Sequence, residues 1–598
     1  MKIRKFIIHN SLFIILLVAA VLRLWNLGGN PPHLTPDEAA LGYNAYSILK
    51  TARDEYGEFL PIFFKSFGDY KPGLYVYLTV PFVAILGLNE FAVRLPNALA
   101  GVIAVWLLYL ISKELFTGKK FGIWNLEFGI WPAILLAVNP WHIHFSRGAW
   151  EANVSLTLTL MGVYFFLKSL KTSKFLVLSS LFFSLTLITY QGAKLSTAIV
   201  VGILFLVFWK EFWSRHTILA RTVLVSILIG LIFTLPVLLS FYQGKTGRLG
   251  IFSIFTWKRP EPYLQNILSQ GDEKVGDLTY YPFHSESLNT ARGILGRWLN
   301  HFSGRFLFFE GDWQNPRHFI PNHGMLLLAD LILLILGLIT LIKGGLKKDS
   351  SNSSGRGTLF ILLWLVLAPM PAALSRDQVH AVRALNMIVP VVLISSFGIV
   401  KITKNFRGNY SLGKTVGGYN RNQPVGLISF KHPSSSFIQI LGFGSLYLAS
   451  FIYVVDAYFV HLPKHNSKYW DYGYKQIVEA VTPIQKNYKL VRVQQSFAQP
   501  YIYFLFYQKY DPVKYQKQAK FIESEYKGDV GYIEKLDNIC FCPIDWSVNR
   551  GDIETLFVAD TIRIPVEDSN DQKNFNVIRD IKYPDGIYTA FRVVEVKQ

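Results

Sequence analysis

Cysteine is almost absent from this sequence of 598 residues, which contains only Cys540 and Cys542. A single residue separates the two cysteines, and this spacing suits neither a relaxed disulfide nor a paired zinc site. The sequence also lacks a Gly-x-Gly-x-x-Gly turn opening a helix, which argues against a dinucleotide-binding enzyme of the common type. We therefore assign the cysteines no role and expect no cofactor.

Acidic residues are scarce relative to basic ones: 40 Asp and Glu against 60 Lys and Arg, for a net charge of +20. In a soluble protein such an excess would favour nucleic-acid binding. Here much of the excess lies in short loops between apolar segments, where basic residues determine orientation in a membrane. The expected partners are therefore membrane lipids and not nucleic acid.

Long apolar runs recur from Leu12 to Val455. A bilayer core needs roughly 20 apolar residues per helix. Several runs come near that length, for example Met325 to Ile342 and Phe360 to Leu374. Residues 1–455 are therefore predicted to be mainly α, forming a polytopic transmembrane helical bundle of about eleven to thirteen spans.

Basic residues in short loops favour the cytoplasmic side of a membrane and so predict the orientation. The basic N-terminus would be cytoplasmic, in an integral protein of the plasma membrane, and loops 30–72 and 240–323 would lie outside. Segment 73–88 is expected to be interfacial or re-entrant, because a full crossing there would place the next basic loop, around Lys119, on the wrong side.

The last part of the chain, residues 456–598, changes character. It combines a helix-like stretch from Tyr474 to Gln485 with strand-like runs such as Leu490 to Gln494 and Thr589 to Val594. Alternating elements of this kind predict a small α/β domain. The orientation derived above places this soluble domain outside the cytoplasm.

Ionisable residues recur at the outer ends of the predicted spans, where charges are costly and tend to mark function. Each has an ordinary explanation: helix capping for the two adjacent acids, snorkelling or an aromatic belt for the lysines and the tyrosine, a surface ion pair, or loop solvation. Together they indicate a site between helices at the outer membrane face. The residues are Asp37, Glu38, Lys71, Arg147, Glu151, Tyr190, Lys194, Arg317, His318, Arg376, Asp377, His380 and Arg383.

An enzyme facing away from the cytoplasm needs a substrate that is already activated, because nucleotides are generally lacking there. A sugar on polyprenyl phosphate meets this need, since the phosphate is the leaving group. Cationic side chains would neutralise the charge on the leaving phosphate, and a carboxylate would take the proton of the acceptor hydroxyl. One base acting opposite the leaving group would invert the anomeric centre.

At these residues the sequence resembles the GT-C membrane glycosyltransferases, in particular the family 39 group with the protein O-mannosyltransferases and the aminoarabinose transferase of lipid A. The resemblance covers most of the chain from Arg23 to Arg383. The matching features, in order, are Asp37-Glu38, Lys71-Pro72, Arg94-Leu95-Pro96, and Ser146-Arg147 followed by Glu151.

The resemblance implies a metal-independent, inverting glycosyl transfer from a polyprenyl-phosphate-linked sugar to a protein, lipid or glycan acceptor. It makes Asp37 the general base, beside Glu38 in the same catalytic motif, and places Lys71 at the lipid phosphate. Arg147 and Glu151 would lie near the sugar or acceptor. Further members of the same cavity would be Tyr190, Lys194, His380 and Arg383. The chain departs from many relatives in carrying Glu151 in place of Asp and Lys194 in place of Arg.

A polytopic transporter or lipid flippase is the main alternative, since it would share the apolar spans and the charges at membrane depth. The absence of an obvious inverted repeat and the gathering of charges at one face disfavour it. An inactive scaffold that displays the C-terminal domain is a further alternative, and it predicts that the charges at the span ends are dispensable.

Overall fold

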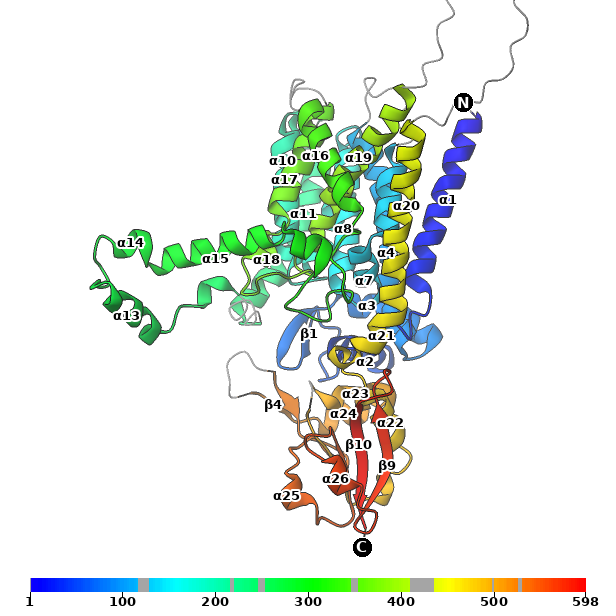
Figure 1. The fold of residues 1–598 in the computed structure, drawn as a ribbon, viewed down its shortest axis with the longest axis vertical. Coiled ribbons are helices and arrows are strands. Elements are labelled where there is room, and N and C mark those ends of the chain that lie inside the picture. The colour runs from blue at the N-terminus through cyan, green and yellow to red at the C-terminus, as the bar shows by residue number, and fades with distance from the viewer. Residues whose placement is uncertain are drawn as a thin grey trace, which may run out of the picture.

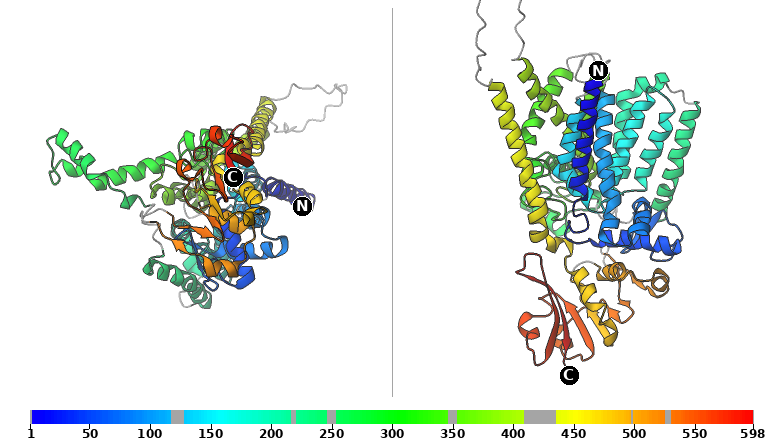
Figure 2. Two further views of the ribbon diagram at one scale, coloured as in Figure 1. Left: turned by 90° about the horizontal axis from the view of Figure 1, so that it is seen from below. Right: turned by 90° about the vertical axis from the view of Figure 1, so that its right-hand side faces the viewer.

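The computed structural model describes residues 2–116, 128–215, 220–245, 253–345, 353–408, 435–496, 499–524 and 530–597. The molecule is elongated, with a bundle of roughly parallel helices at one end and a domain containing a β-sheet at the other (Figure 1). The N-terminus lies at the far end of the bundle, and the C-terminus lies at the tip of the sheet domain (Figures 1 and 2). The fold is therefore mainly α with a C-terminal α/β domain, as predicted.

Six helical segments among the described residues are long and apolar enough to cross a membrane. They are Glu90–Leu115, Ala193–Arg215, Arg221–Tyr242, Gly355–Ala373, Leu385–Thr403 and Leu441–His465. Shorter apolar segments are Asn10–Leu24, Leu74–Leu86 and Phe175–Leu187. The chain is an integral membrane protein.

The bundle is built from helices in chain order. Their bounds are α1 Lys2–Leu24, α3 Leu74–Leu86, α4 Glu90–Leu115, α6 Ile130–Val138, α7 Pro140–Arg147, α8 Glu151–Ser169, α9 Phe175–Leu187, α10 Ala193–Arg215, α11 Arg221–Tyr242, α16 Asp330–Gly345, α17 Ser353–Leu367, α18 Met370–Ala373, α19 Ile388–Gly408 and α20 Ser435–Asp456. The 13 residues of α3 extend about 20 Å at the helical rise of about 1.5 Å per residue, less than the roughly 30 Å of a bilayer core. An interfacial or re-entrant α3 remains the prediction.

Two basic segments used to predict the orientation, around Lys119 and after α19, lie outside the described residues. Residues 408–415 also have the Gly-x-x-x-x-Gly-Lys-Thr spacing of a phosphate-binding loop. Such a loop follows a β-strand, whereas here the helix α19 precedes it. The spacing therefore does not indicate a nucleotide site.

The first predicted outer loop forms a compact layer between the bundle and the sheet domain (Figure 1). It contains α2, Pro36–Thr51, and a hairpin of β1, Phe63–Ser66, with β2, Asp69–Pro72. In the second, η2 Ile254–Thr256, α13 Glu261–Gln270, α14 Tyr280–Phe283 and α15 Glu286–Asn300 form an arm that projects sideways from the bundle (Figure 1), and the π-helical turn η3, Arg305–Phe309, follows. Residues 246–252 of this loop are not described.

The C-terminal domain follows α20 and contains a six-stranded mixed sheet of order β6-β7-β3-β8-β10-β9. The strands are β3 Leu490–Val493, β6 Lys535–Leu536, β7 Ile539–Cys540, β8 Thr555–Ala559, β9 Phe575–Lys582 and β10 Thr589–Val596, and a separate pair is β4 Phe521–Ile522 with β5 Tyr532–Ile533. Short helical elements complete it: η5 Ala457–His461, α21 Leu462–His465, η6 Ser467–Trp470, α22 Tyr474–Val481, α23 Pro500–Tyr507, α24 Pro512–Gln518, α25 Trp546–Asn549 and α26 Val566–Ser569.

The C-terminal domain shares a hydrophobic core with the first loop. Side chains of α2, α3 and α4 belong to the same buried cluster as those of α22, α23 and the sheet. The Tyr43 hydroxyl of α2 donates to the carbonyl of Tyr510 at 3.1 Å, and that of Tyr503 donates to the carbonyl of Leu34 at 3.0 Å. The domain is thus docked on the end of the bundle that carries α2 and the hairpin.

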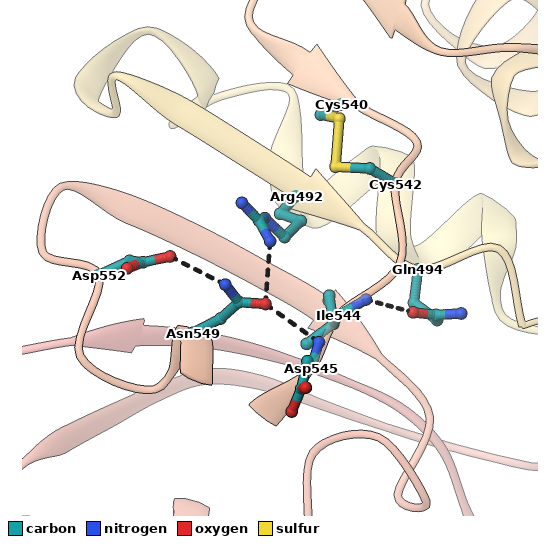
Figure 3. The surroundings of a disulfide bond; sticks show 8 residues. All are labelled: Arg492, Gln494, Cys540, Cys542, Ile544, Asp545, Asn549 and Asp552. Atoms are coloured by element: carbon teal, nitrogen blue, oxygen red, sulfur yellow. Dashed lines mark hydrogen bonds between the residues drawn. A yellow bond between two sulfur atoms is a disulfide. The ribbon is translucent and has the colours of Figure 1, made fainter. Parts of the chain in front are cut away.

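Cys540 and Cys542 form a disulfide, so the expectation that they have no role in the structure was wrong (Figure 3). Their Cα atoms are 5.3 Å apart, within the usual range for a disulfide. Side chains at positions i and i+2 of an extended chain point to the same side. Because β7 ends at Cys540, the chain is free to bend and bring the two residues closer than a continuous strand would.

Candidate active site

An ion pair between Asp37 and Lys71 lies in the layer between the bundle and the C-terminal domain. Asp37 is in the first turn of α2, and Lys71 is in β2, where it pairs with Phe64 of β1. The Asp37 side chain is 60% exposed, whereas that of Lys71 is 13% exposed. An accessible carboxylate and a half-enclosed ammonium therefore lie side by side at one end of the bundle.

The start of α2 explains how Asp37 is held. Thr35 caps the helix: its hydroxyl accepts from the Glu38 amide at 3.2 Å, and the Glu38 carboxylate accepts from the Thr35 amide at 2.9 Å. This reciprocal pair is a capping box, which stabilises the first helical turn. Pro36 at the first helical position adds a preset backbone angle. Asp37 is thus left as the exposed acid of a rigid turn.

Glu151, at the start of α8 and outside the six candidate spans, faces the same pair. Burial raises the pKa of its carboxyl to about 7, the positive charge of Lys71 lowers it, and the negative charge of Asp37 raises it. Electrostatic effects of this kind require proximity. Three of the residues predicted from the sequence, Asp37, Lys71 and Glu151, are therefore brought together.

Tyr190, between α9 and α10, connects this group to Arg383. Burial raises the pKa of the Tyr190 hydroxyl to about 12, the Arg383 charge acts to lower it, and the Glu151 charge acts to raise it. Arg383 itself forms an ion pair with Asp377 at 3.0 Å. Tyr190 therefore lies within the fields of both Glu151 and Arg383.

Lys194 lies beside the hairpin at the start of α10. Its ammonium donates to the side-chain oxygen of Gln191, whose amide in turn donates to the Tyr70 carbonyl at 3.0 Å. The ammonium also lies 5.8 Å from the ring centroid of Phe63 and 5.1 Å from that of Phe241. Lys194 thus adds a second cation close to the strand that carries Lys71.

Glu38 and Arg147 occupy buried positions that face backbone and not solvent. Glu38 pairs with Arg94 at 2.9 Å and accepts from the Ala149 amide at 2.8 Å. Arg147 donates to the carbonyls of Leu22, Trp25 and Asn30 at 2.8, 2.6 and 2.8 Å. Both side chains hold the first loop against the bundle, which was not apparent from the sequence.

The C-terminal domain contributes one acid to the same region. Burial raises the pKa of Asp471 to about 6, Arg317 lowers it through an ion pair at 3.0 Å, and the charge of Asp37 raises it slightly. The sequence carried no signal for Asp471, because its importance comes from docking of the domain. Arg317 was recognised only as part of a polar pair in the long loop.

His380 belongs to a further group, with Asp312 and His318, whose potential ligand atoms all lie within 4.8 Å of one another. Asp312 was not singled out in the sequence, because 68 residues separate it from His380. Glu55 was also missed: it is fully buried, and burial raises the pKa of its carboxyl to about 8. A separate apolar cavity lined by Leu176, Phe183, Leu204 and Ile227 contains no ionisable side chain and is not part of the site.

Comparison with known proteins adds one match over part of the chain. Residues 70–239 match the family model described as dolichyl-phosphate-mannose-protein mannosyltransferase. No curated protein matches the sequence.

Two solved structures share the general arrangement. ArnT from Cupriavidus metallidurans bound to undecaprenyl phosphate is 11% identical, with a TM-score of 0.49, over 98% of this chain and 97% of that one. The oligosaccharyltransferase AglB from Archaeoglobus fulgidus, in complex with an inhibitory peptide and a dolichol-phosphate, is 13% identical with a TM-score of 0.48, over 85% of this chain. The match spans only 64% of AglB.

At these identities and TM-scores the likeness supports no inference about ligands or activity. The family-model match, in contrast, confirms over residues 70–239 the resemblance to the dolichyl-phosphate-mannose-protein mannosyltransferases, a group of GT-C membrane glycosyltransferases.

Proposed function

We propose that this protein is a membrane glycosyltransferase that moves a sugar from a polyprenyl-phosphate donor to an acceptor on the extracytoplasmic side. The observation that carries the proposal is the Asp37–Lys71 ion pair, exposed on its carboxylate side and placed at one end of an apolar bundle. The family match over residues 70–239 supports the same reaction class. A hexose or pentose is the expected sugar, with mannose the first to test because the matched family is named for it.

The chemistry assigned to the pair is a single displacement. The acceptor hydroxyl attacks the anomeric carbon while its proton passes to the Asp37 carboxylate. The bond between the anomeric carbon and the phosphate oxygen breaks, and the phosphate leaves with both electrons. Because the base and the leaving group act on opposite faces, the anomeric configuration inverts.

Cationic side chains are assigned to the leaving phosphate. Lys71 is the first of them, since its ammonium lies beside Asp37 and a compact point charge suits a phosphate. Lys194 and Arg383 lie on either side of Tyr190 in the sequence and supply further positive charge near the same region. Neutralising the phosphate lowers the barrier to its departure.

Glu38 and Arg147 take positioning roles in this proposal, in place of the direct roles expected from the sequence. The Glu38 carboxylate is already used by Arg94 and two backbone amides. Arg147 is used by backbone carbonyls of the first loop. Glu151, with its pKa near 7, remains assigned to the sugar or the acceptor.

The proposal is tested by mass spectrometry of lipid-linked sugars and surface glycans in cells with and without the gene. Loss of a glycan together with accumulation of one polyprenyl-phosphate sugar is the expected result, and it would identify both substrates. Unchanged glycans and donors would contradict glycosyl transfer. Altered distribution of a lipid-linked sugar between the two leaflets, without any lost glycan, would favour a flippase.

A further inference from the structure

A buried group of metal-ligating side chains lies outside the Asp37–Lys71 pair. It consists of Asp312, His318 and His380, called here the His–Asp cluster, and its ligand atoms all lie within 4.8 Å of one another. Ligand atoms bound to one zinc ion at 2.0–2.2 Å lie about 3.4 Å apart in a tetrahedral arrangement. Small rotations of two imidazole rings are therefore enough to close the cluster on an ion.

Two loops hold the cluster in place. The Asp312 carboxylate accepts from the Ala381 amide at 2.7 Å and from the Asn315 side chain at 2.9 Å, which ties residues 310–323 to residues 375–384. His318 Nδ1 lies 2.9 Å from the Asp312 carboxylate. The rings of His318 and His380 have centroids 5.0 Å apart. The donor atoms are thus arranged by hydrogen bonds that exist before any ion binds.

The orientation of His380 leaves one ring nitrogen for a ligand role. The Arg383 amide donates to His380 Nδ1 at 3.3 Å, which directs Nε2 away from the backbone of its own loop. The His380 amide donates to His301 Nε2 at 3.2 Å and fixes the loop from the other side. Backbone contacts that set the orientation of a histidine ring are typical of metal ligands.

The burial of Asp312 requires a compensating positive charge. Its side chain is fully buried, and among the described residues only His318 lies within ion-pair distance of it. A histidine carries charge only when it is protonated. A buried carboxylate without a cationic partner is costly, and a metal ion would supply the missing charge.

We propose that the His–Asp cluster binds one divalent transition-metal ion of the zinc type. Two imidazoles and one carboxylate suit zinc and its neighbours, whereas Mg²⁺ and Ca²⁺ prefer oxygen ligands throughout. Three protein ligands leave at least one coordination position open. This assignment departs from the metal-independent reaction that the family resemblance implied.

The cluster adjoins the candidate active site through the loop that carries Arg383. His380 and Arg383 lie on the same short loop, and the Arg383 charge acts on Tyr190. An ion bound at the cluster would fix this loop and offer an open position to an anionic oxygen. The last clause rests on the proposed function, because the oxygen would belong to the donor phosphate.

Metal binding is tested on the full-length protein in lipid nanodiscs, stripped with a strong chelator and then titrated with Zn²⁺, Mn²⁺ or Mg²⁺. We expect one equivalent of Zn²⁺ by elemental analysis, tight binding by calorimetry, and little binding of Mg²⁺. The His318→Gln and His380→Gln variants should each weaken Zn²⁺ binding by at least about a hundredfold, since each removes a ligand. The matched control is His461→Gln: His461 also faces an acid, Asp456 at 3.1 Å, but its side chain is 48% exposed.

The proposal is overturned if stripped wild-type protein takes up no Zn²⁺, a result that does not depend on any variant folding. It is equally overturned if the His318→Gln and His461→Gln proteins, both eluting as the wild type does, bind Zn²⁺ equally well. Neither measurement uses a donor or an acceptor. A protein that binds Zn²⁺ at the cluster but transfers no sugar would therefore contradict the proposed function and leave the metal site standing.

Discussion

Lys71 lies among three acids with different surroundings. It pairs directly with exposed Asp37, and its charge also acts on buried Glu151 and on buried Glu55. A phosphate that binds Lys71 would compete with Asp37 for the ammonium and leave the carboxylate available to an acceptor. The resting ion pair would thus be replaced by two separate contacts in the complex.

Lys71→Ala should weaken binding of a polyprenyl phosphate by about ten- to a hundredfold, because a hydrogen bond to a charged group contributes about 1.5–3 kcal/mol. Titration of the lipid phosphate into purified protein measures the effect. Lys65→Ala is the matched control on the same hairpin, since the Lys65 ammonium lies 3.8 Å from Glu523 and 4.6 Å from the ring centroid of Phe521. Equal weakening by both variants would contradict the phosphate role.

Glu55 should make stability depend on pH. Burial raises its carboxyl pKa from 4.5 to about 8 in the folded state, so the folded protein holds a proton that the unfolded chain has already released. The contribution is fully present below about pH 4.5 and is lost as pH rises through about 8. The melting temperature should therefore fall from about pH 5 to about pH 9, and less steeply in Glu55→Gln, which mimics the protonated form.

Thermal melts of both proteins across this range measure the difference between the two slopes, so that other titrating groups cancel. Asp54 is a neighbouring acid with a raised pKa and is unchanged in both proteins. Parallel curves for wild type and Glu55→Gln would show that the buried carboxyl is not linked to folding.

Sequence reasoning at the scale of single residues succeeded where chain neighbours carry the signal. Asp37-Glu38 and Lys71-Pro72 stand out as charges beside apolar segments, and the structure places Asp37 against Lys71. It could not distinguish an acid that faces a cavity from one that caps a helix, so Glu38 was grouped with Asp37. Asp312 was missed because burial and long-range pairing, which define it, have no local pattern.

Helix packing in the bundle depends on glycines where backbones approach closely. A Cβ added at Gly337 of α16 would lie 1.9 Å from the Ile394 carbonyl oxygen of α19, and one at Gly398 of α19 would lie 2.2 Å from the Leu333 carbonyl oxygen of α16. Small residues at such contacts let helices pack in a membrane. The contact is reciprocal, so neither helix can move aside for a side chain without separating from the other.

Gly337→Ala should therefore lower the melting temperature in detergent by several degrees, because the methyl group forces α16 away from α19. Gly442→Ala on α20 is the control, since no atom lies within 4 Å of a Cβ built there. Scanning fluorimetry of the two variants gives the comparison. Similar melting temperatures for both would show that the close helix contact does not limit stability.

At the scale of elements, apolar runs predicted the helical bundle well because bilayer length is a strong constraint. Short elements were less predictable. The hairpin of β1 and β2 was not recognised, since its four-residue strands carry only a weak alternation. The Cys540–Cys542 disulfide was excluded on spacing alone, and the end of β7 between the two residues was not visible in the sequence.

At the scale of the whole molecule, the C-terminal domain covers the end of the bundle that carries the candidate site. Arg317 of the long loop pairs with Asp471 of this domain, and α2 shares its hydrophobic core. This arrangement explains why the domain could be recognised from composition while its contribution to the site could not. The proposed orientation requires the domain and the site to face away from the cytoplasm together.

Cysteine labelling in intact cells tests this orientation. Ile562→Cys, at a side chain 86% exposed in the C-terminal domain, should react with a membrane-impermeant maleimide from outside. Thr117→Cys and Ser350→Cys, in loops beyond the described residues, should react only after permeabilisation. The two native cysteines are paired and should stay unreactive. The opposite labelling pattern would reverse the proposed topology.

The central claim is that Asp37 acts as the base in sugar transfer from a lipid phosphate, and the most direct measurement is product formation by Asp37→Asn in proteoliposomes supplied with donor and acceptor. The variant should insert, melt and bind donor phosphate as the wild type does, but lose transfer by at least about a hundredfold, the contribution expected of a general base. Glu567→Gln, an exposed acid in the first turn of α26, should retain full transfer. Product formation by Asp37→Asn at the wild-type rate would contradict the account.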